Sequence, residues 1–186
     1  MAVLPITIYP APILKRKAKQ VPAVTDEIRR LLDDMAETMY AAPGIGLAAP
    51  QVNVGLRVIV VDVGEPVPLL DRTEPKETRR KLYQLVNPEI VAREGEVENE
   101  EGCLSIPHFR QVMKRRAKVT VRALDRTGKP IEIAGHELLS VALQHEIDHL
   151  EGKLIIDGLS QLKKEQYLRQ LKQWEKEQAA HVPGEL

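Results

Sequence analysis

Two histidines separated by three residues mark the part of this chain with the clearest capacity for chemistry. Residues 144–152 read QHEIDHLEG, so His145 and His149 lie one turn apart on the same face of a predicted helix. Two imidazoles in this arrangement can bind one metal ion, and Glu146 beside them can act as a general base toward a metal-bound water. The segment therefore indicates metal-assisted hydrolysis, with a coincidental match in a surface helix as the alternative.

A catalytic site of this kind needs a third protein ligand and one position for water. In metzincin proteases the third ligand is a histidine, but the corresponding position here is Ile155, which excludes that class. Glu165 and Glu175 could serve as in thermolysin-like enzymes, but both fall in a charge-rich segment typical of a solvated helix. The single cysteine, Cys103, would complete a Cys-His-His set as a thiolate, although a lone cysteine is otherwise often a small buried hydrophobe.

Three blocks of the chain resemble the motifs of the peptide deformylase family. They are GIGLAAPQ at 44–51, EGCLS at 101–105 and QHEIDH at 144–149, and they occur in the family's order. The N-terminal segment and the C-terminal helix also look like those of bacterial members. The resemblance implies an enzyme that hydrolyses the N-formyl group from the N-terminal formyl-methionine of newly made polypeptides and releases formate.

The predicted metal site holds one divalent ion on Cys103, His145 and His149. This ligand set suits zinc, whereas the family commonly works with ferrous iron, so we expect Fe²⁺ in the cell with Zn²⁺ or Ni²⁺ as alternatives. Glu146 would take a proton from the attacking water and pass it to the leaving amine. Asp148 is expected to face outward or to support the ligands from behind.

Donors for the developing oxyanion are implied by the resemblance. It assigns them to the side-chain amide of Gln51 and the backbone N–H of Leu104, and each can donate without titrating. For Gln51 the alternative is a turn residue that bonds its own loop. Glu101, at the start of the same block as Leu104, is expected to be structural and paired with Arg115.

Substrate contacts are predicted on both sides of the metal. Gly44 and Gly46 could simply form a turn, but they also allow close backbone approach, and the resemblance implies that the nascent chain pairs with this segment as an added strand. Four residues are candidates for an apolar pocket that would hold the methionine side chain. Leu138, Val141 and Ala142 precede His145 by seven, four and three residues, and Ile45 belongs to the glycine block. Arg110 matches an arginine near the substrate in the family, and it could also form a surface ion pair.

Composition limits the class of protein. The 186 residues are 43% hydrophobic, with a formal net charge of zero and one cysteine, which predicts a single domain over 1–186 in a reducing compartment. Nothing global indicates binding to DNA. Pro5 and Pro10 interrupt any N-terminal apolar run, and no stretch approaches the ~18 apolar residues of a membrane span. We therefore expect a cytoplasmic protein with no membrane association.

The elements around these residues predict an α+β fold, with mixed, mainly antiparallel sheets around a central HExxH helix and a C-terminal helix. Thr25 is the expected N-cap of a first helix that Pro43 ends. An exposed loop is predicted over 64–81, where prolines and charges cluster. The remaining predicted elements are strands at 57–63, 84–92 and 118–125, a hairpin partner at 131–133, and helices at 136–151 and 160–180.

The C-terminal helix carries five basic and three acidic residues, and in bacterial relatives it also contacts the ribosome. A solvated helix docked on the core is the simpler interpretation. Two other functions compete with deformylation. A zinc endopeptidase would leave the GIGLAAPQ and EGCLS blocks unexplained, and a non-catalytic ribosome-binding protein would not need every catalytic residue.

Overall fold

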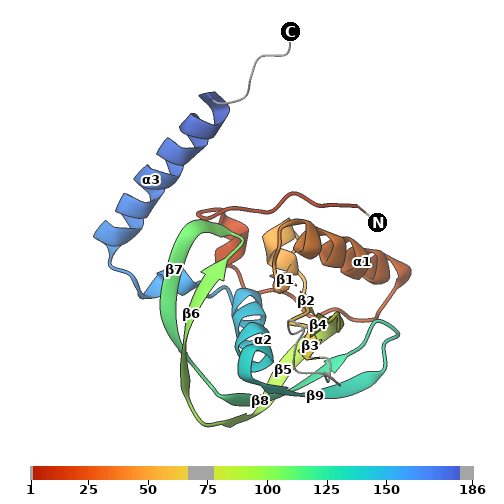
Figure 1. Ribbon diagram of the computed structural model, residues 1–186. Helices are drawn as coiled ribbons and strands as arrows, with labels where there is room; N and C mark the ends of the chain where they lie inside the picture. The colour runs from red at the N-terminus through yellow and green to blue at the C-terminus, as the bar shows by residue number, and fades with distance from the viewer. Residues whose placement is uncertain (1, 67–77, 181–186) are drawn as a thin grey trace, which may run out of the picture.

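The computed structural model describes residues 2–66 and 78–180, which form an α+β fold built around a five-stranded sheet, a two-stranded hairpin and a central helix (Figure 1). The larger sheet has the strand order β1-β2-β5-β8-β9. Its strands are β1 (Gly46–Ala48), β2 (Val58–Val61), β5 (Tyr83–Glu94), β8 (Lys118–Leu124) and β9 (Pro130–His136). The second sheet is the hairpin of β6 (Val97–Cys103) and β7 (Ile106–Arg115). All described ladders are antiparallel, and one isolated parallel bridge joins Lys19 to Leu56.

Three α-helices accompany the sheets: α1 (Asp26–Ala41), α2 (Glu137–Leu150) and α3 (Gln161–Ala180). Short 3-10 turns occupy Pro12–Lys15 (η1), Ala49–Val52 (η2) and Ile155–Gly158 (η3). The predicted fold class is therefore confirmed, including the central and C-terminal helices. No helix in the two described ranges combines the length and apolar character needed to cross a bilayer.

Strand β2 is covered on both faces because α1 and α2 pack on opposite sides of it. Val58 and Val60 join the cluster built on α1, while Ile59 and Val61 join the cluster built on α2. This explains why all four residues of the strand are buried and why its sequence is continuously apolar. The helix that carries the two histidines is thereby held against a rigid sheet.

The first helix begins as its sequence predicts. The Thr25 hydroxyl accepts a hydrogen bond from the backbone N–H of Ile28, and Asp26 and Glu27 occupy the first turn, where the helix dipole favours acidic residues. Leu32, Met35 and Met39 form its buried stripe.

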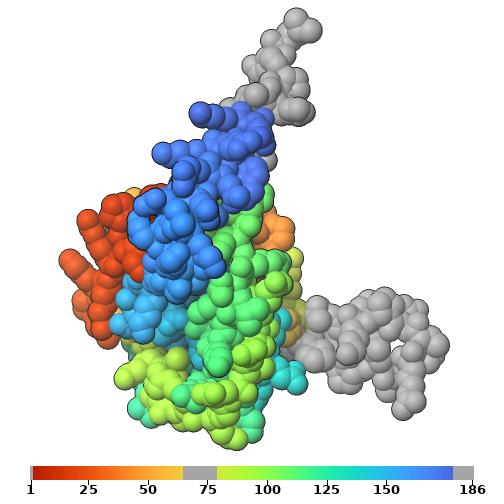
Figure 2. Space-filling model, turned by 90° about the vertical axis from the view of Figure 1, so that its left-hand side faces the viewer, coloured from red at the N-terminus to blue at the C-terminus, as the bar shows by residue number. Residues whose placement is uncertain are grey.

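The β6–β7 hairpin was not predicted from the sequence. Its first strand reads VENEEGC. The residues are mostly polar and of low strand propensity, and they lack the alternation of apolar and polar residues by which a strand is recognised in a sequence. The hairpin is stabilised instead by packing at its base, where Ile106, Phe109 and Met113 join a third cluster with Tyr167 and Leu171 of α3. Figure 2 shows the lower part of α3 lying against this hairpin and the rest of the helix projecting from the body.

Only the two ends of the predicted loop at 64–81 can be placed, since residues 67–77 lie outside the described residues. These ends pair as the short antiparallel strands β3 (Glu65–Pro66) and β4 (Thr78–Arg79). The segment is also tied to the body, because Asp62 Oδ1 accepts hydrogen bonds from the backbone N–H groups of Gly64 and Lys81.

Candidate metal centre and active site

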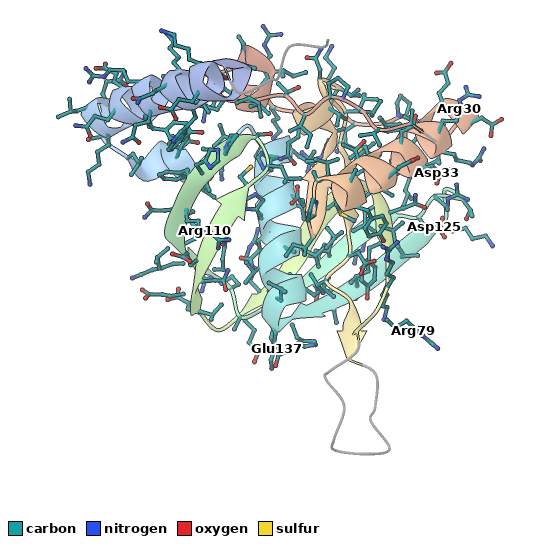
Figure 3. All side chains as sticks on the ribbon, turned by 45° about the horizontal axis from the view of Figure 1, so that its top comes forward. Arg30, Asp33, Arg79, Arg110, Asp125 and Glu137 are labelled. Carbon is teal, nitrogen blue, oxygen red and sulfur yellow. The ribbon has the colours of Figure 1, made fainter. Side chains whose placement is uncertain are left out.

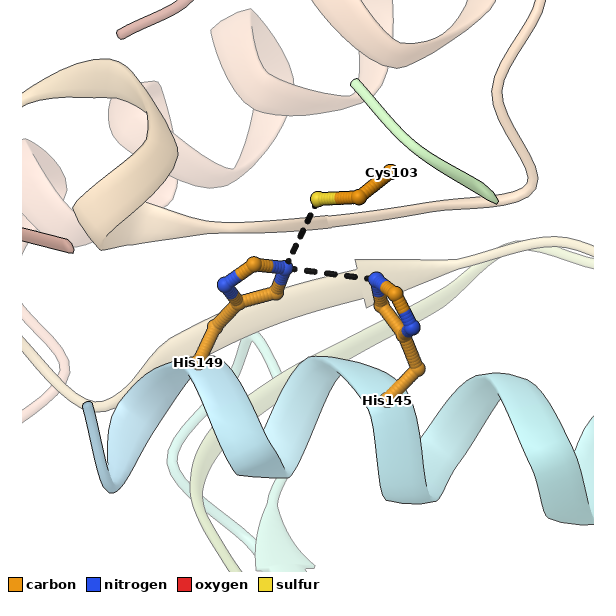
Figure 4. Close-up of side chains that lie close together, drawn as sticks. All are labelled: Cys103, His145 and His149. Carbon is orange, nitrogen blue, oxygen red and sulfur yellow. Dashed lines mark hydrogen bonds between the residues drawn. The ribbon is translucent and has the colours of Figure 1, made fainter. Parts of the chain in front are cut away.

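Cys103, His145 and His149 come together between α2 and the end of β6 (Figure 4). The helix presents both imidazoles from successive turns, and the hairpin brings the thiol over them. The Nε2 atom of His149 lies 3.2 Å from Cys103 Sγ and 3.3 Å from His145 Nε2. The three donor atoms therefore converge on one point.

The separation of the two imidazole nitrogens fits a shared ion. Two imidazole nitrogens bound to one tetrahedral ion at about 2.0–2.1 Å are separated by roughly 3.3–3.4 Å, which matches the distance between the two Nε2 atoms. A thiolate with two neutral imidazoles is also a donor set that zinc and other first-row metals accept. The residues present therefore fit a divalent metal ion.

A buried ion-pair network lies behind the first histidine. The carboxylate of Glu101 accepts a hydrogen bond from His145 Nδ1 at 2.8 Å, so that Nε2 is turned toward the other two donors. Arg115 binds Glu101 through two nitrogens, at 2.6 and 2.8 Å, and reaches Asp148 at 2.5 Å. The expected pairing of Glu101 with Arg115 is confirmed, and Asp148 supports the ligands from behind through the same arginine.

The two imidazoles differ in their electrostatic surroundings. Burial alone would lower the pKa of His145, but the hydrogen bonds to Cys103 and Glu101 outweigh it and raise that pKa well above its usual value. Burial together with the positive charge of His145 and Arg115 lowers the pKa of His149 well below its usual value. The two imidazoles thus differ in their tendency to hold a proton, and a cation bound between Cys103 and His145 would compete with the proton on His145.

Glu146 faces the same region from the next position on α2. Its carboxylate is buried, and Oε2 has no hydrogen-bond partner among the described residues. Burial raises the pKa of Glu146 to about 7. The carboxylate packs against the backbone of β1, since a Cβ added to Gly46 would overlap Oε1. Gly46 is therefore required for the carboxylate to occupy this position.

A cavity of about 370 Å³ opens beside these groups, within the size range of small-molecule sites. It is lined by twelve of the thirteen predicted site residues, all except His149: Gly44, Ile45, Gly46, Gln51, Cys103, Leu104, Arg110, Leu138, Val141, Ala142, His145 and Glu146. Ile45 and Leu138 are 43% and 45% exposed and form an apolar rim, while Val141 and Ala142 are buried in the wall.

Gln51 is buried in the 3-10 turn that follows β1, and it has both a local and a long-range role. Its Oε1 atom accepts a hydrogen bond from the backbone N–H of Ala48 at 2.8 Å, as expected for a residue that bonds its own loop. Its Nε2 atom lies 3.2 Å from Ser105 Oγ and 3.5 Å from Cys103 Sγ. The donor end of the amide is therefore directed at the metal-binding group.

Arg110 lies on β7 at the side of the cavity (Figure 3). Its guanidinium is 3.6 Å from the carboxylate of Glu100, and both side chains are largely exposed. The arginine therefore belongs to a surface ion pair, which was the alternative interpretation, and it also borders the cavity.

Four residues that line the cavity were not predicted to belong to the site: Pro43, Asn99, Glu100 and Gly102. Three of them belong to β6, which the sequence did not reveal as a strand. Ser105 was part of the EGCLS block but received no role, although its hydroxyl contacts Gln51. The only available signal for Ser105 was its place two residues after the cysteine.

This chain is similar to known proteins along nearly its whole length. The family profile described as polypeptide deformylase matches residues 3–165. The chain is 49% identical to a peptide deformylase of Thermodesulfovibrio yellowstonii, over 92% of this chain and 98% of that protein. It is 52% identical to a peptide deformylase of Nitrosococcus oceani, over 89% of this chain and 92% of that protein.

Solved structures show the same likeness. The crystal structure of a peptide deformylase from Legionella pneumophila aligns with a TM-score of 0.82 and 44% identity, over 98% of this chain and 100% of that chain. The structure of peptide deformylase from Ehrlichia chaffeensis in complex with actinonin aligns with a TM-score of 0.81 and 37% identity, over 94% and 99% of the two chains.

Proposed function

Because this chain belongs to the polypeptide deformylase family, whose members are metal-dependent hydrolases, we propose that Cys103, His145 and His149 hold its metal ion and that Glu146 moves the proton. The protein hydrolyses the N-formyl group of N-terminal formyl-methionine on newly made polypeptides and releases formate. One observation carries the assignment of residues. The three metal-binding atoms converge beside a buried carboxylate oxygen that has no partner among the described residues.

In this proposal Glu146 is the residue that transfers the proton. The bound ion would act as a Lewis acid and lower the pKa of water, so that a nucleophile is available near neutral pH. Glu146 accepts the proton at Oε2 during attack on the formyl carbon and then delivers it to the leaving amine nitrogen. Burial favours the protonated carboxyl that this second transfer requires.

Two donors stabilise the oxyanion in this proposal. The side chain of Gln51 supplies an Nε2–H and Leu104 supplies its backbone N–H. The 3.5 Å distance from Gln51 Nε2 to Cys103 Sγ supports the first assignment. For Leu104 the support is that it directly follows Cys103 and lines the cavity.

The polypeptide binds along β1. This strand lies at the edge of the larger sheet, with β2 on one side, so its other side is available to an added strand. Gly44, Ile45 and Gly46 line the cavity at this edge. Main-chain pairing of this kind suits an enzyme that accepts many sequences after the first residue.

The methionine side chain enters the apolar part of the cavity. Val141 and Ala142 form its wall and Ile45 and Leu138 its rim, and Arg110 borders the path of the following residues. Replacing Val141 with a larger residue should raise KM for formyl-Met peptides more than it lowers kcat, since the pocket binds substrate but does not touch the reacting atoms.

The test of this assignment uses two peptides and two proteins. Wild-type protein should release formate from formyl-Met-Ala-Ser and should leave an N-blocked internal peptide intact. Glu146→Ala should act on neither peptide, while it retains a full equivalent of metal. Cleavage of the internal peptide by the wild-type protein would instead indicate an endopeptidase.

Three finer assignments complete the proposal. Fe²⁺ is the ion in the cell, with Zn²⁺ or Ni²⁺ as alternatives that the same ligands accept, and residues 1–186 act as one catalytic domain in the cytoplasm. Metal analysis after anaerobic purification, with activity measured for each reconstituted ion, tests the first of these.

The C-terminal helix α3 would contact the ribosome. Its net positive charge and its projection from the body support this (Figures 1 and 2). Co-sedimentation with ribosomes should weaken as salt rises, and it should be lost when Lys163, Lys164 and Lys172 are replaced by glutamine. Binding that is unchanged in this variant would contradict the assignment.

A further inference from the structure

The amide of Gln51 has one orientation in this fold. Its side chain is 1% exposed, and Oε1 faces the backbone N–H of Ala48 at 2.8 Å. A backbone N–H can only donate, so the amide cannot turn over without leaving that donor unpaired in a buried place. The Nε2 end must therefore carry the two hydrogens that point away from the turn.

Only one of these two hydrogens is needed for catalysis. The other requires an acceptor, because a buried amide hydrogen without a partner costs about 1–3 kcal/mol. Ser105 Oγ lies 3.2 Å from Nε2, and this serine is 0% exposed. With one hydrogen on Ser105, the planar geometry of the amide directs the second toward the space beside Cys103 Sγ, which is 3.5 Å away.

The backbones that carry the two side chains are both bonded to the N-terminal segment. The N–H of Thr7 donates to the carbonyl of Gln51 at 2.7 Å, and the N–H of Tyr9 donates to the carbonyl of Ser105 at 2.9 Å. One short stretch of the N-terminal segment therefore ties the backbone of Gln51 to the backbone of Ser105.

We propose that Ser105 is a positioning residue for deformylation: its buried hydroxyl accepts one Nε2–H of Gln51 so that the other is presented to the oxyanion. The inference rests on the role proposed above for Gln51. Losing a single oxyanion donor lowers kcat by roughly 10²-fold or more, which sets the upper limit for a residue that acts only through that donor. We expect Ser105→Ala to lower kcat about tenfold, with little change in KM.

A double-mutant cycle separates this role from a merely structural one. The kcat for a formyl-Met tripeptide is measured for wild type, Ser105→Ala, Gln51→Ala and the double variant, each with its metal content determined. If Ser105 acts through Gln51, the double variant should match Gln51→Ala, because nothing remains to be positioned. An additional tenfold loss in the double variant, or a kcat within twofold of wild type for Ser105→Ala, would overturn the inference.

The chain provides a matched control on the far side of α2. Ser140 is also 0% exposed, and its hydroxyl accepts a hydrogen bond from the Nε2 of a glutamine, Gln144, at 3.1 Å. Ser140 does not line the cavity. Ser140→Ala should therefore destabilise the protein to a similar degree and keep kcat within twofold of wild type. A tenfold loss in this control too would show that the effect of Ser105→Ala is general.

A wild-type measurement covers the case in which Ser105→Ala does not fold. In a crystal structure of the zinc form with a peptide hydroxamate, Gln51 Nε2 should contact Ser105 Oγ and an inhibitor oxygen at the same time. An amide turned away from Ser105 would refute the inference. If Gln51→Ala itself retains wild-type kcat, the oxyanion role of Gln51 fails together with the inference. If the two single substitutions lower kcat independently, so that their effects multiply in the double variant, only the inference about Ser105 fails.

Discussion

At the scale of single residues, the surroundings of Glu146 determine what its substitution should do. The carboxylate lies against the backbone of β1 and faces the cavity, but it is not one of the three converging metal-binding atoms. Glu146→Ala should therefore keep one equivalent of metal while kcat falls by roughly 10²–10⁴-fold, the usual contribution of a general acid–base. Atomic absorption and formate release measure the two quantities.

Cys103→Ala is the comparison for that variant, since it removes a ligand and should lose tightly bound metal and activity together. Near-normal kcat in Glu146→Ala would remove the proposed proton carrier. A full equivalent of tightly bound metal in Cys103→Ala would place the third ligand elsewhere.

Gly46 offers a second test, because only a missing side chain allows Glu146 its position. A Cβ at Gly46 would overlap Oε1, and the neighbouring atoms of the same carboxylate are almost as close. In Gly46→Ala the carboxylate must move, so kcat should drop by about tenfold or more, since displacements near 1 Å cost up to ~10²-fold. Metal content should stay at one equivalent.

Gly55→Ala is the matched control, because a Cβ there meets nothing within 4 Å. It should leave kcat within twofold of wild type. Equal losses in both glycine variants would mean that backbone flexibility, and not the position of Glu146, explains the effect.

The residues that do chemistry differ in how far the sequence reveals them. His145 and His149 follow from helical periodicity and Glu146 from its place in the HExxH segment, because these residues lie within about one helical turn of one another. The role of Ser105 does not follow from any local pattern, because its hydroxyl contacts Gln51, which lies 54 positions away in the sequence. Contacts of that range depend on the folded arrangement of β6, β7 and the N-terminal segment, which no local pattern encodes.

The same distinction holds at the scale of elements. Strand β2 was predictable because burial imposes continuous apolar residues on it. Helix α2 was predictable from the spacing of its two histidines, although most of its residues are buried. The β6–β7 hairpin has alternating burial along β7, but its exposed and half-exposed positions include polar and apolar residues alike. Its position is set by Glu101 and Arg115, a buried pair that joins the hairpin to α2 through Asp148.

Asp62 connects several elements and should make stability depend on pH. Its carboxylate accepts hydrogen bonds from the Tyr40 hydroxyl of α1 at 2.6 Å and from the N–H groups that begin and end the 64–81 segment. Burial raises the pKa of Asp62, but these hydrogen bonds and the charge of Arg80 outweigh it, so the folded-state pKa lies below the usual value. The carboxylate is therefore a stabilising group when ionised.

The sign of the effect follows from that direction. Because the folded pKa is depressed, the stabilisation is fully present above the unfolded pKa of about 4, and it is lost as pH falls through the folded value. Asp62→Asn should lower the free energy of unfolding at pH 7, and the difference from wild type should shrink below about pH 4. Urea unfolding at both pH values measures this. A constant difference would show that Asp62 contributes through packing and not through its charge.

At the scale of the whole molecule, the N-terminal segment connects all three blocks that build the site. Thr7 donates to Gln51 in the first block and Tyr9 to Ser105 in the second, while the N–H of Ala18 donates to the carbonyl of Leu150 at the end of α2. Gly152, just beyond that helix, approaches the carbonyl of Lys15 so closely that a Cβ would overlap it. The relative positions of the proposed metal ligands and oxyanion donors therefore depend on a segment that contains none of the proposed catalytic residues.

The last prediction concerns the identity of the ion and the lifetime of the enzyme in air. If Fe²⁺ is the working metal, activity should decay faster in air than it does in the zinc or nickel form. Ferrous iron is redox-active, and dioxygen can then oxidise the neighbouring Cys103 thiolate to sulfenic and sulfinic acid. Zinc cannot change its oxidation state, so it removes that route.

The experiment follows activity over time in air for the three forms, with mass spectrometry of the peptide that contains Cys103. Because this is the only cysteine of the chain, any added thiol oxygen is assigned without ambiguity. The iron form should lose activity in step with the appearance of oxidised Cys103, and an anaerobic sample should lose neither. Equal lifetimes for the iron and zinc forms with an unmodified cysteine would contradict the prediction, since the thiolate would then be insensitive to the redox chemistry of the ion it binds.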